Sequence, residues 1–153
     1  MTHLLDTSAI IGWLERRNSS LPAMLGASDT ALYHPVTLGE LHAGGERADG
    51  EAERDMRRNT LAFAAQRLEA VEGHVLAYEQ FGFLTARFSR KLSHNDYWIV
   101  AAAVASPGLE LVTEDQKLFG VVTSGALALA VSERGWKPPT CHLAESTPIQ
   151  PTT

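Results

Sequence analysis

The sequence predicts an α/β domain with a mostly parallel central sheet of about four or five strands and helices on both faces. Short apolar runs of strand length alternate with longer segments in which apolar residues recur at helical spacing. The chain of 153 residues is long enough for one sizeable core and too short for two independently stable domains. Strands separated by helices are joined by right-handed crossovers, which makes neighbouring strands parallel.

The expected elements alternate along the chain. Strands are expected at Thr2–Leu5, Thr30–Tyr33, 70–72, Leu109–Thr113 and 127–131. Helices are expected at 9–17, 35–43, 51–68, 74–92 and 97–105. Gly44 and Gly45 are expected to end the second helix, and Pro107 with Gly108 the last. Residues 1–140 form the predicted domain, and 141–153, rich in proline and threonine, is expected to be a loose tail.

Composition places the chain among ordinary globular proteins. With 44% hydrophobic and 20% charged residues, it has no collagen-like, disordered or disulfide-rich bias. The single cysteine, Cys141, cannot form an intramolecular disulfide, which fits a reducing cytoplasm. The N-terminus reaches Asp6 without the apolar core of a signal peptide, and the apolar stretch 99–105 is too short to cross a bilayer. We therefore expect a cytoplasmic protein with no membrane partner.

The net charge of −5 is unfavourable for a protein that approaches a polyanion. The electrostatic potential can still be positive over a limited surface. Either divalent cations bound by clustered acids or a local group of basic residues would reverse its sign there. The bases that would line such a path are Arg54, Arg57, Arg58, Arg87, Arg90 and Lys91. The alternative is a solvated helix face on which bases pair with Glu51, Glu53 and Asp55, and the sequence leaves both interpretations open.

Four acidic residues follow expected strands or lie near the start of expected helices. Asp6 follows the first strand and Asp115 follows the strand at 109–113, so both project from the carboxyl edge of a parallel sheet, where such sheets bind ligands. Glu40 lies one turn into a helix and Asp96 begins another. If those helices begin at the same edge, their first-turn side chains reach the same place. The sequence therefore predicts a cluster of four carboxylates.

Each acid on its own also has a purely structural interpretation. Asp is a favoured helix cap, and the positive end of a helix dipole stabilises carboxylates. Thr37 and Glu40 form the pattern of a capping box, in which Glu40 bonds back to the backbone NH of Thr37. Capping does not explain why four carboxylates would lie close together, because neighbouring carboxylates repel each other unless a proton or a cation relieves the repulsion.

The donor types decide which cation fits such a cluster. All-oxygen ligation favours Mg²⁺ or Mn²⁺, and no paired histidine or cysteine spacing indicates zinc. The isolated histidines, which are expected to be surface or core residues, are His3, His34, His42 and His94.

Four motifs, in this order, resemble those of the PIN-domain family, in particular the VapC-type toxins of toxin–antitoxin pairs. The first is LLDTS at 4–8, and the second is TLGEL at 37–41. The third is ND at 95–96 with the apolar helix through Ala103, and the fourth is LVTED at 111–115 followed by Phe119. The resemblance spans most of the chain and implies a PIN-like three-layer sandwich.

The resemblance also implies roles for residues within these motifs. The acidic quartet corresponds to Asp6, Glu40, Asp96 and Asp115. The expected ligands of Mg²⁺ or Mn²⁺ are Asp6, Asp96 and Asp115, while Glu40 would either ligate the metal or orient the attacking water. The expected supporting residues, which have helix capping as their alternative role, are Ser8, Asn95 and Thr113. Glu114 stands beside Asp115, so the motif leaves open which of the two faces the metal.

The activity implied by the resemblance is that of a metal-dependent endoribonuclease acting as a toxin. The expected substrate is structured RNA of the tRNA or rRNA class, cut to leave a 5′-phosphate and a 3′-hydroxyl. The expected partners are a cognate antitoxin, which would obstruct the acidic cleft, and a second copy of the chain in a homodimer. Apolar faces on the helices that begin at Ala9 and Glu51 are a candidate antitoxin groove, although a core face has the same pattern.

Three other functions fit less well. A PIN fold that binds RNA or a partner protein without hydrolysis would lack one of the acids, and none is missing. A phosphatase of the haloacid-dehalogenase type requires an aspartate two residues after Asp6, where Ser8 stands. A receiver domain carries its phosphoacceptor at the end of a later strand.

Overall fold

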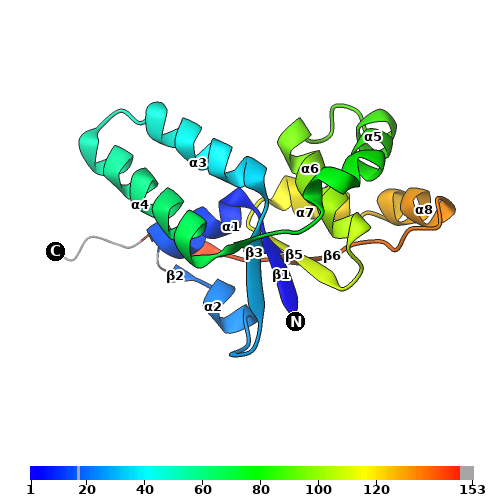
Figure 1. Cartoon of the computed structure of the whole chain (residues 1–153), viewed down its shortest axis with the longest axis horizontal. Helices are drawn as coiled ribbons and strands as arrows, with labels where there is room; N and C mark the ends of the chain where they lie inside the picture. The colour runs from blue at the N-terminus through cyan, green and yellow to red at the C-terminus, as the bar shows by residue number, and fades with distance from the viewer. Residues whose placement is uncertain (17, 149–153) are drawn as a thin grey trace.

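The computed structural model of the chain describes residues 1–16 and 18–148 (Figure 1). The strands are β1 (Thr2–Leu5), β2 (Asn18–Ser19), β3 (Thr30–Tyr33), β4 (Glu69–Ala70), β5 (Leu109–Thr113), β6 (Thr140–Leu143) and β7 (Ser146–Thr147). The α-helices are α1 (Thr7–Ile11), α2 (Leu21–Met24), α3 (Pro35–Glu46), α4 (Glu51–Arg67), α5 (Tyr78–Arg87), α6 (His94–Ala105), α7 (Gln116–Val122) and α8 (Gly125–Glu133). A π-helical turn, η1 (Gly12–Arg16), continues α1, and a 3₁₀ turn, η2 (His74–Ala77), precedes α5.

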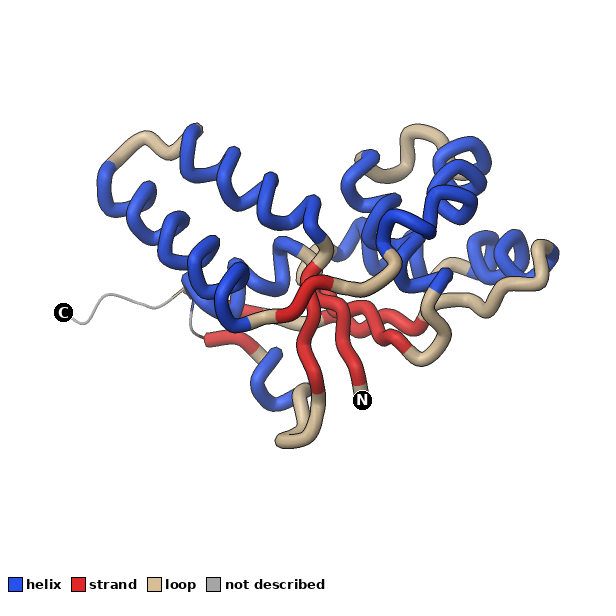
Figure 2. The backbone as a smooth tube through the Cα atoms, in the orientation of Figure 1, coloured by secondary structure: helices blue, strands red, loops and turns tan. Residues whose placement is uncertain are grey.

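A five-stranded sheet in the order β4-β3-β1-β5-β6 forms the centre of the molecule. All of its pairings are parallel, as the sequence predicts. Leu5 at the end of β1 stands level with Tyr33 of β3 and Val112 of β5, so these strands end together. Figure 2 shows the strands gathered between the helices, with the short β2 and β7 pairing separately.

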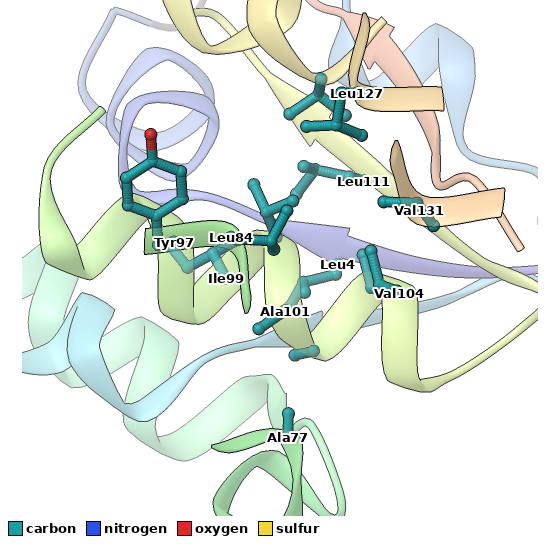
Figure 3. Packing of buried hydrophobic residues seen from close by; sticks show 14 of the residues in the cluster. Leu4, Ala77, Leu84, Tyr97, Ile99, Ala101, Val104, Leu111, Leu127 and Val131 are labelled. Atoms are coloured by element: carbon teal, nitrogen blue, oxygen red, sulfur yellow. The ribbon is translucent and has the colours of Figure 1, made fainter. Parts of the chain in front are cut away.

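Helices cover both faces of the sheet, and consecutive strand residues point to opposite cores. Leu4 and Leu111 belong to the larger core, where they pack with α6 residues such as Ile99 and Val104 (Figure 3). Leu5 and Val112, the next residues along, belong to a second core that includes Ile10 of α1. This alternation is the two-residue period of a strand whose two faces are both buried. The expected three-layer arrangement is confirmed.

Two expectations for the C-terminal part of the chain are wrong. The segment 127–131 is not a strand, because it lies inside α8, where Ser124 caps the helix and the buried positions Leu127, Ala130 and Val131 recur at helical spacing. The last strand of the main sheet is β6, which pairs with β5 through Thr140 to Leu143. Residues 141–143 are therefore part of the sheet and not of a loose tail, and 149–153 lie outside the described residues.

Two helix boundaries also differ from expectation. Gly44 and Gly45 do not end α3, which continues to Glu46, and a Cβ on Gly44 would lie 3.4 Å from the Arg57 side chain of α4. That distance is an ordinary van der Waals contact with a flexible side chain, so neither glycine is required by the pairing of α3 with α4 that Figure 1 shows. The expected helix at 74–92 is divided into η2 and α5, and it ends at Arg87. Within the described residues, no helix has the length and hydropathy needed to cross a membrane.

Leu111→Ala tests the importance of the larger core. Leu111 is fully buried on the interior strand β5, and its truncation leaves a cavity in the core that includes α6. We expect the free energy of unfolding to fall by about 2–5 kcal/mol, measured by urea denaturation. The matched control is Leu129→Ala, at a side chain that is 63% exposed, which should change stability by less than about 0.5 kcal/mol. Equal effects of the two substitutions would contradict the assignment of the core.

Candidate active site

Asp6 is the most deeply buried acid at the carboxyl edge of the sheet. Its NH donates to the carbonyl of Val112, 3.1 Å away, so the β1–β5 ladder fixes its position. One carboxylate oxygen, Oδ1, accepts from the NH of Ala9 at 2.9 Å and from Ser8 Oγ at 2.8 Å. The other, Oδ2, accepts from Thr113 Oγ1 at 2.5 Å. Asp6 therefore caps α1, as its structural interpretation requires, while its hydrogen bonds tie β1 to β5.

Burial raises the pKa of Asp6 from 3.8 to about 6. The hydrogen bonds from Thr113, Ala9 and Ser8 oppose this rise, and the charge of Asp96 adds to it. Desolvation outweighs the hydrogen bonds because Asp6 is only 4% exposed and little water reaches the carboxylate. A raised pKa at a shared polar site is typical of functional carboxylates.

Ser8 and Thr113 hold the Asp6 carboxylate by hydrogen bonds and also bind the backbone that follows β5. Besides its bond to Asp6, Ser8 Oγ accepts from the NH of Glu114 at 2.9 Å and lies 3.2 Å from Thr113 Oγ1. Thr113 Oγ1 also accepts from the NH of Asp115 at 2.9 Å. The two hydroxyls connect the first motif to the fourth and hold the backbone after β5 against the start of α1.

Glu40 reaches the site from α3 and does not form the expected capping box. His34 caps α3 through Nδ1, which accepts from the NH of Val36 at 3.1 Å. Glu40 Oε1 instead accepts from Thr7 Oγ1 at 2.9 Å, a bond from the residue that follows Asp6. Burial raises the pKa of Glu40, and the charge of Asp96 raises it further. The structural interpretation of Glu40 as a cap is therefore wrong.

Asp96 interacts electrostatically with each of the other acids. It is the third residue of α6, and its NH donates to Ser93 Oγ, the N-cap, at 3.2 Å. Burial raises the pKa of Asp96, hydrogen bonds with Ser93 lower it, and the charge of Asp115 raises it again. Asp96 likewise raises the pKa values of Asp6 and Glu40. The four acids thus share one electrostatic environment with Asp96 at its centre.

The neighbours Asp115 and Glu114 are placed differently. Asp115 caps α7 through Oδ1, which accepts from the NH groups of Lys117 and Leu118 at 2.9 and 3.1 Å. The Glu114 carboxylate lies over Gly12, where a Cβ would come within 1.3 Å of Oε2. Asp115 is the member of this pair whose charge acts on Asp96.

Some residues at the site differ from the sequence prediction. Asn95 is exposed and, within the described residues, makes no side-chain hydrogen bond, so its supporting role stays a prediction. Thr7 and Ser93 have positioning roles that sequence reasoning missed, although Thr7 lies inside the first motif. Lys117 was also missed, and its charge lowers the pKa of Asp96. The other expectation, that the isolated histidines are core or surface residues, agrees with His3 and His34 being buried and His42 and His94 being exposed.

The side chains at this edge suit a hard divalent cation chemically. The donors are carboxylates and hydroxyls, the ligands that Mg²⁺ and Mn²⁺ prefer. Burial raises the pKa of the Cys141 thiol on β6 to about 12, so without a metal ion the thiol stays protonated at neutral pH. In the described parts of the chain, no three Asp, Glu, His or Cys side chains already enclose a common point suited to a metal ion. Ligation would therefore require rotation of the half-buried Asp96 and Asp115.

A family model for the PIN domain matches residues 3–122. The match includes every acid described above and all of the β1–β5 ladder except Thr2. The chain belongs to the PIN-domain family. PIN domains are generally nucleases, so nucleic-acid hydrolysis is the class of chemistry that this fold supports.

Solved structures share this PIN fold. VapBC-5 from Mycobacterium tuberculosis, a member of the VapBC family of toxin–antitoxin systems, is 23% identical, with a TM-score of 0.59 over 82% of this chain and 94% of that one. VapBC2 from Rickettsia felis, bound to a DNA fragment from its promoter, is 17% identical, with a TM-score of 0.65 over 94% and 98%. FitAcB from Neisseria gonorrhoeae is 19% identical, with a TM-score of 0.56 over 91% and 95%. No curated protein sequence matches the chain.

Asp6→Asn tests whether the ionised carboxylate destabilises the PIN domain. The folded pKa of about 6 lies above the ordinary 3.8, so the fold favours the protonated acid. The stability that Asp6 contributes below about pH 4 is therefore lost as the pH rises through about 6. Asparagine can still hydrogen-bond but does not ionise. Without divalent cations, we expect the variant to exceed the wild type in stability by about 2–3 kcal/mol above about pH 7.

The measurement is urea denaturation of both proteins over a pH series. The two curves should converge below about pH 4, because the wild-type acid is then protonated in the fold. A difference in stability that does not vary with pH, or a less stable variant at neutral pH, would show that burial does not penalise the charge of Asp6.

Proposed function

We propose that this PIN-domain protein is a metal-dependent endoribonuclease and the toxin of a toxin–antitoxin pair. The observation that carries the proposal is the mutual electrostatic effect of Asp96 with Asp6, Glu40 and Asp115 at one edge of the sheet. Acids gathered in this way, three of them with raised pKa values, are stabilised by a divalent cation. The proposed substrate is RNA of the tRNA or rRNA class, and the proposed metal is Mg²⁺ or Mn²⁺.

The residues that would hold the metal are Asp6, Asp96 and Asp115. A lone pair of Asp6 Oδ2 remains after its bond with Thr113, and the Asp115 oxygen not used in capping α7 is also available. When bound, Mg²⁺ or Mn²⁺ lowers the pKa of a water molecule and offsets negative charge that develops on phosphate oxygens. Ser8 and Thr113 keep the Asp6 carboxylate in a single orientation.

Glu40 is the proposed proton acceptor for the attacking water. Burial raises its pKa, which makes the carboxylate a stronger base than an exposed glutamate. Thr7 holds Oε1 by a hydrogen bond, which leaves Oε2 to accept a proton from water. Lys117, beside Asp96, is positioned to attract the phosphate group of the substrate.

The proposed antitoxin partner would bind in a groove between η1 and α4. Apolar side chains line it, among them Leu14, Met56 and Phe63, and Met56 is 40% exposed. Phe63 contacts Trp13 of η1 edge to face at 5.5 Å, which joins η1 to α4 at the groove. An amphipathic helix is the kind of segment that fits such a groove. Support comes from the VapBC and FitAB structures, in which toxin-type PIN folds are described together with their antitoxins.

The proposal also includes a homodimer. Leu76, Tyr78 and Leu129 are large apolar side chains exposed by 63–75%. They lie in η2, α5 and α8, on the opposite side of the molecule from α4 in Figure 1. A second copy that covers this side would leave the groove between η1 and α4 free for the antitoxin.

Asp96→Asn is expected to remove RNA cleavage while the protein stays folded. The loss should be about 100-fold or more, because even outer partners of a metal site contribute about 10- to 100-fold. The assay follows a labelled tRNA or rRNA fragment with Mg²⁺ or Mn²⁺, with circular dichroism as the check on folding. Asp55→Asn, at an exposed residue paired with Arg58, is the matched control and should retain full activity. Cleavage that persists in excess EDTA would refute metal dependence, and binding without cleavage by the wild type would favour a non-hydrolytic RNA-binding module.

Expression of the wild type alone is expected to slow growth of a host cell, whereas Asp96→Asn should not. Coexpression of the cognate antitoxin should restore growth, because the antitoxin obstructs the acidic cleft. Met56→Asp should abolish this rescue while leaving RNA cleavage intact, since a charge in the groove opposes an apolar partner helix. Normal growth with abundant soluble wild-type protein would count against the toxin role and would leave the nuclease chemistry standing.

A further inference from the structure

The structure distinguishes two kinds of basic residue in this acidic protein. On α4, Arg54 pairs with Glu51 at 2.9 Å, Arg57 with Glu15 at 3.5 Å and Arg58 with Asp55 at 3.3 Å. For this group the interpretation as a charge-paired helix holds. Their charge is locally balanced, so they offer little attraction to a phosphate backbone.

Arg90 and Lys91 belong to the second kind. They lie in the turn between α5 and α6, both are exposed, and neither forms an ion pair with any residue that the structure describes. Arg87, three residues earlier, lines a different groove with Tyr78 and Arg134 and is not part of this pair. The chain has a net charge of −5, so two adjacent unpaired cations are a local reversal of its charge.

The turn is tied by hydrogen bonds to the first residues of α6, among which Asp96 lies. The NH of Lys91 donates to the carbonyl of Phe88 at 3.2 Å, and the Tyr97 hydroxyl donates to the same carbonyl. Tyr97 is fully buried and directly follows Asp96 in α6. The position of the two cations is therefore linked to that of a proposed metal ligand.

Arg90 occupies a backbone conformation that favours glycine. Its φ is +69°, the one positive value at a non-glycine residue in the described chain. Asn or Gly would adopt this conformation with less strain. An arginine at such a position, exposed and unpaired, suggests that its side chain has a role outside the fold.

His94, three residues after Lys91, belongs to a group of aromatic rings on α5 and α6. Phe81 of α5 stacks on Trp98 of α6 at 4.0 Å and 9°, and it contacts His94 edge to face at 6.0 Å and 82°. Phe81 packs on the larger core. Among the residues that the structure describes, Trp98 belongs to neither of the two core clusters. His94 is exposed and lies two residues before Asp96. The His94 ring is therefore exposed to solvent near the start of α6, where Asp96 also lies.

We propose that Arg90, Lys91 and His94 form a contact surface for single-stranded RNA that leads into the acidic cleft. Unpaired cations beside an exposed ring match the two requirements of such binding, attraction of the backbone and stacking of a base. Arg90 and Lys91 contact phosphates, and a base of the strand stacks on the His94 ring. The inference rests on the proposed nuclease function and specifies how its substrate approaches.

The test measures binding of a labelled single-stranded RNA to Asp96→Asn protein, which does not cut it, over a series of salt concentrations. Arg90→Gly combined with Lys91→Gln removes both charges, and glycine suits the backbone at position 90, so the fold should be retained. We expect weaker binding and a salt slope smaller by about 0.7 for each lost phosphate contact. The matched control is Lys137→Gln, an exposed lysine before β6, at the opposite edge of the sheet. An unchanged slope in the double variant would overturn the proposal.

His94→Ala and His94→Phe separate stacking from charge. Loss of a stacked base should weaken binding by about 5-fold or more, whereas phenylalanine should retain most of the affinity. Equal affinity of all three proteins would overturn the stacking role, as would variants that bind RNA normally and fail only to bind the antitoxin. If the wild type cleaves RNA and these variants bind RNA as well as the wild type does, only the proposed contact surface is refuted. If the wild type neither binds nor cleaves RNA, the proposed function itself is refuted.

Discussion

Repulsion among carboxylates at the carboxyl edge of a parallel sheet is the constraint on which this molecule's chemistry depends. Asp6 is almost fully buried, and its pKa of about 6 records the free-energy cost of ionising it there. Asp96 adds its charge to Asp6 and Glu40, and Asp115 adds its own to Asp96. The hydrogen bonds from Ser8, Thr113 and Thr7 orient these acids without removing the repulsion. A divalent cation would remove it, which connects the stability of the fold to its proposed activity.

The sheet makes this convergence possible because β1, β3 and β5 end level with one another. Leu5 stands beside Tyr33 and Val112, so the next residues of all three strands emerge at the same edge. The cores on both faces fix that register, since a slip by one residue would exchange Leu4 with Leu5. Helices α3 and α6 then begin at this edge and direct Glu40 and Asp96 inward. Rigid elements on both sides of the site limit how far each carboxylate can move.

Much of this arrangement could be predicted from local sequence, and the failures have physical causes. The strands Thr2–Leu5, Thr30–Tyr33 and Leu109–Thr113 are short runs with apolar residues at half or more of their positions, and each was predicted with its observed boundaries. The segment 127–131 is apolar throughout, and only its spacing over a longer window, together with the cap at Ser124, distinguishes a helix from a strand. Strand β6 was missed because it is polar and lies at the sheet edge, where pairing with β5 determines its conformation. The bond from Thr7 to Glu40 spans 33 residues, so it depends on the fold and not on a capping pattern.

The central claim is that Asp6, Asp96 and Asp115 together bind one divalent cation, with Glu40 beside it. The most direct test is a crystal structure of the protein with millimolar Mn²⁺, using anomalous scattering to locate the ion. The account predicts an anomalous peak about 2.0–2.3 Å from carboxylate oxygens of at least two of these aspartates, with oxygen ligands only. Fully occupied Mn²⁺ bound elsewhere, with Asp6 and Asp115 still bound only to the NH groups of the helices they cap, would contradict it.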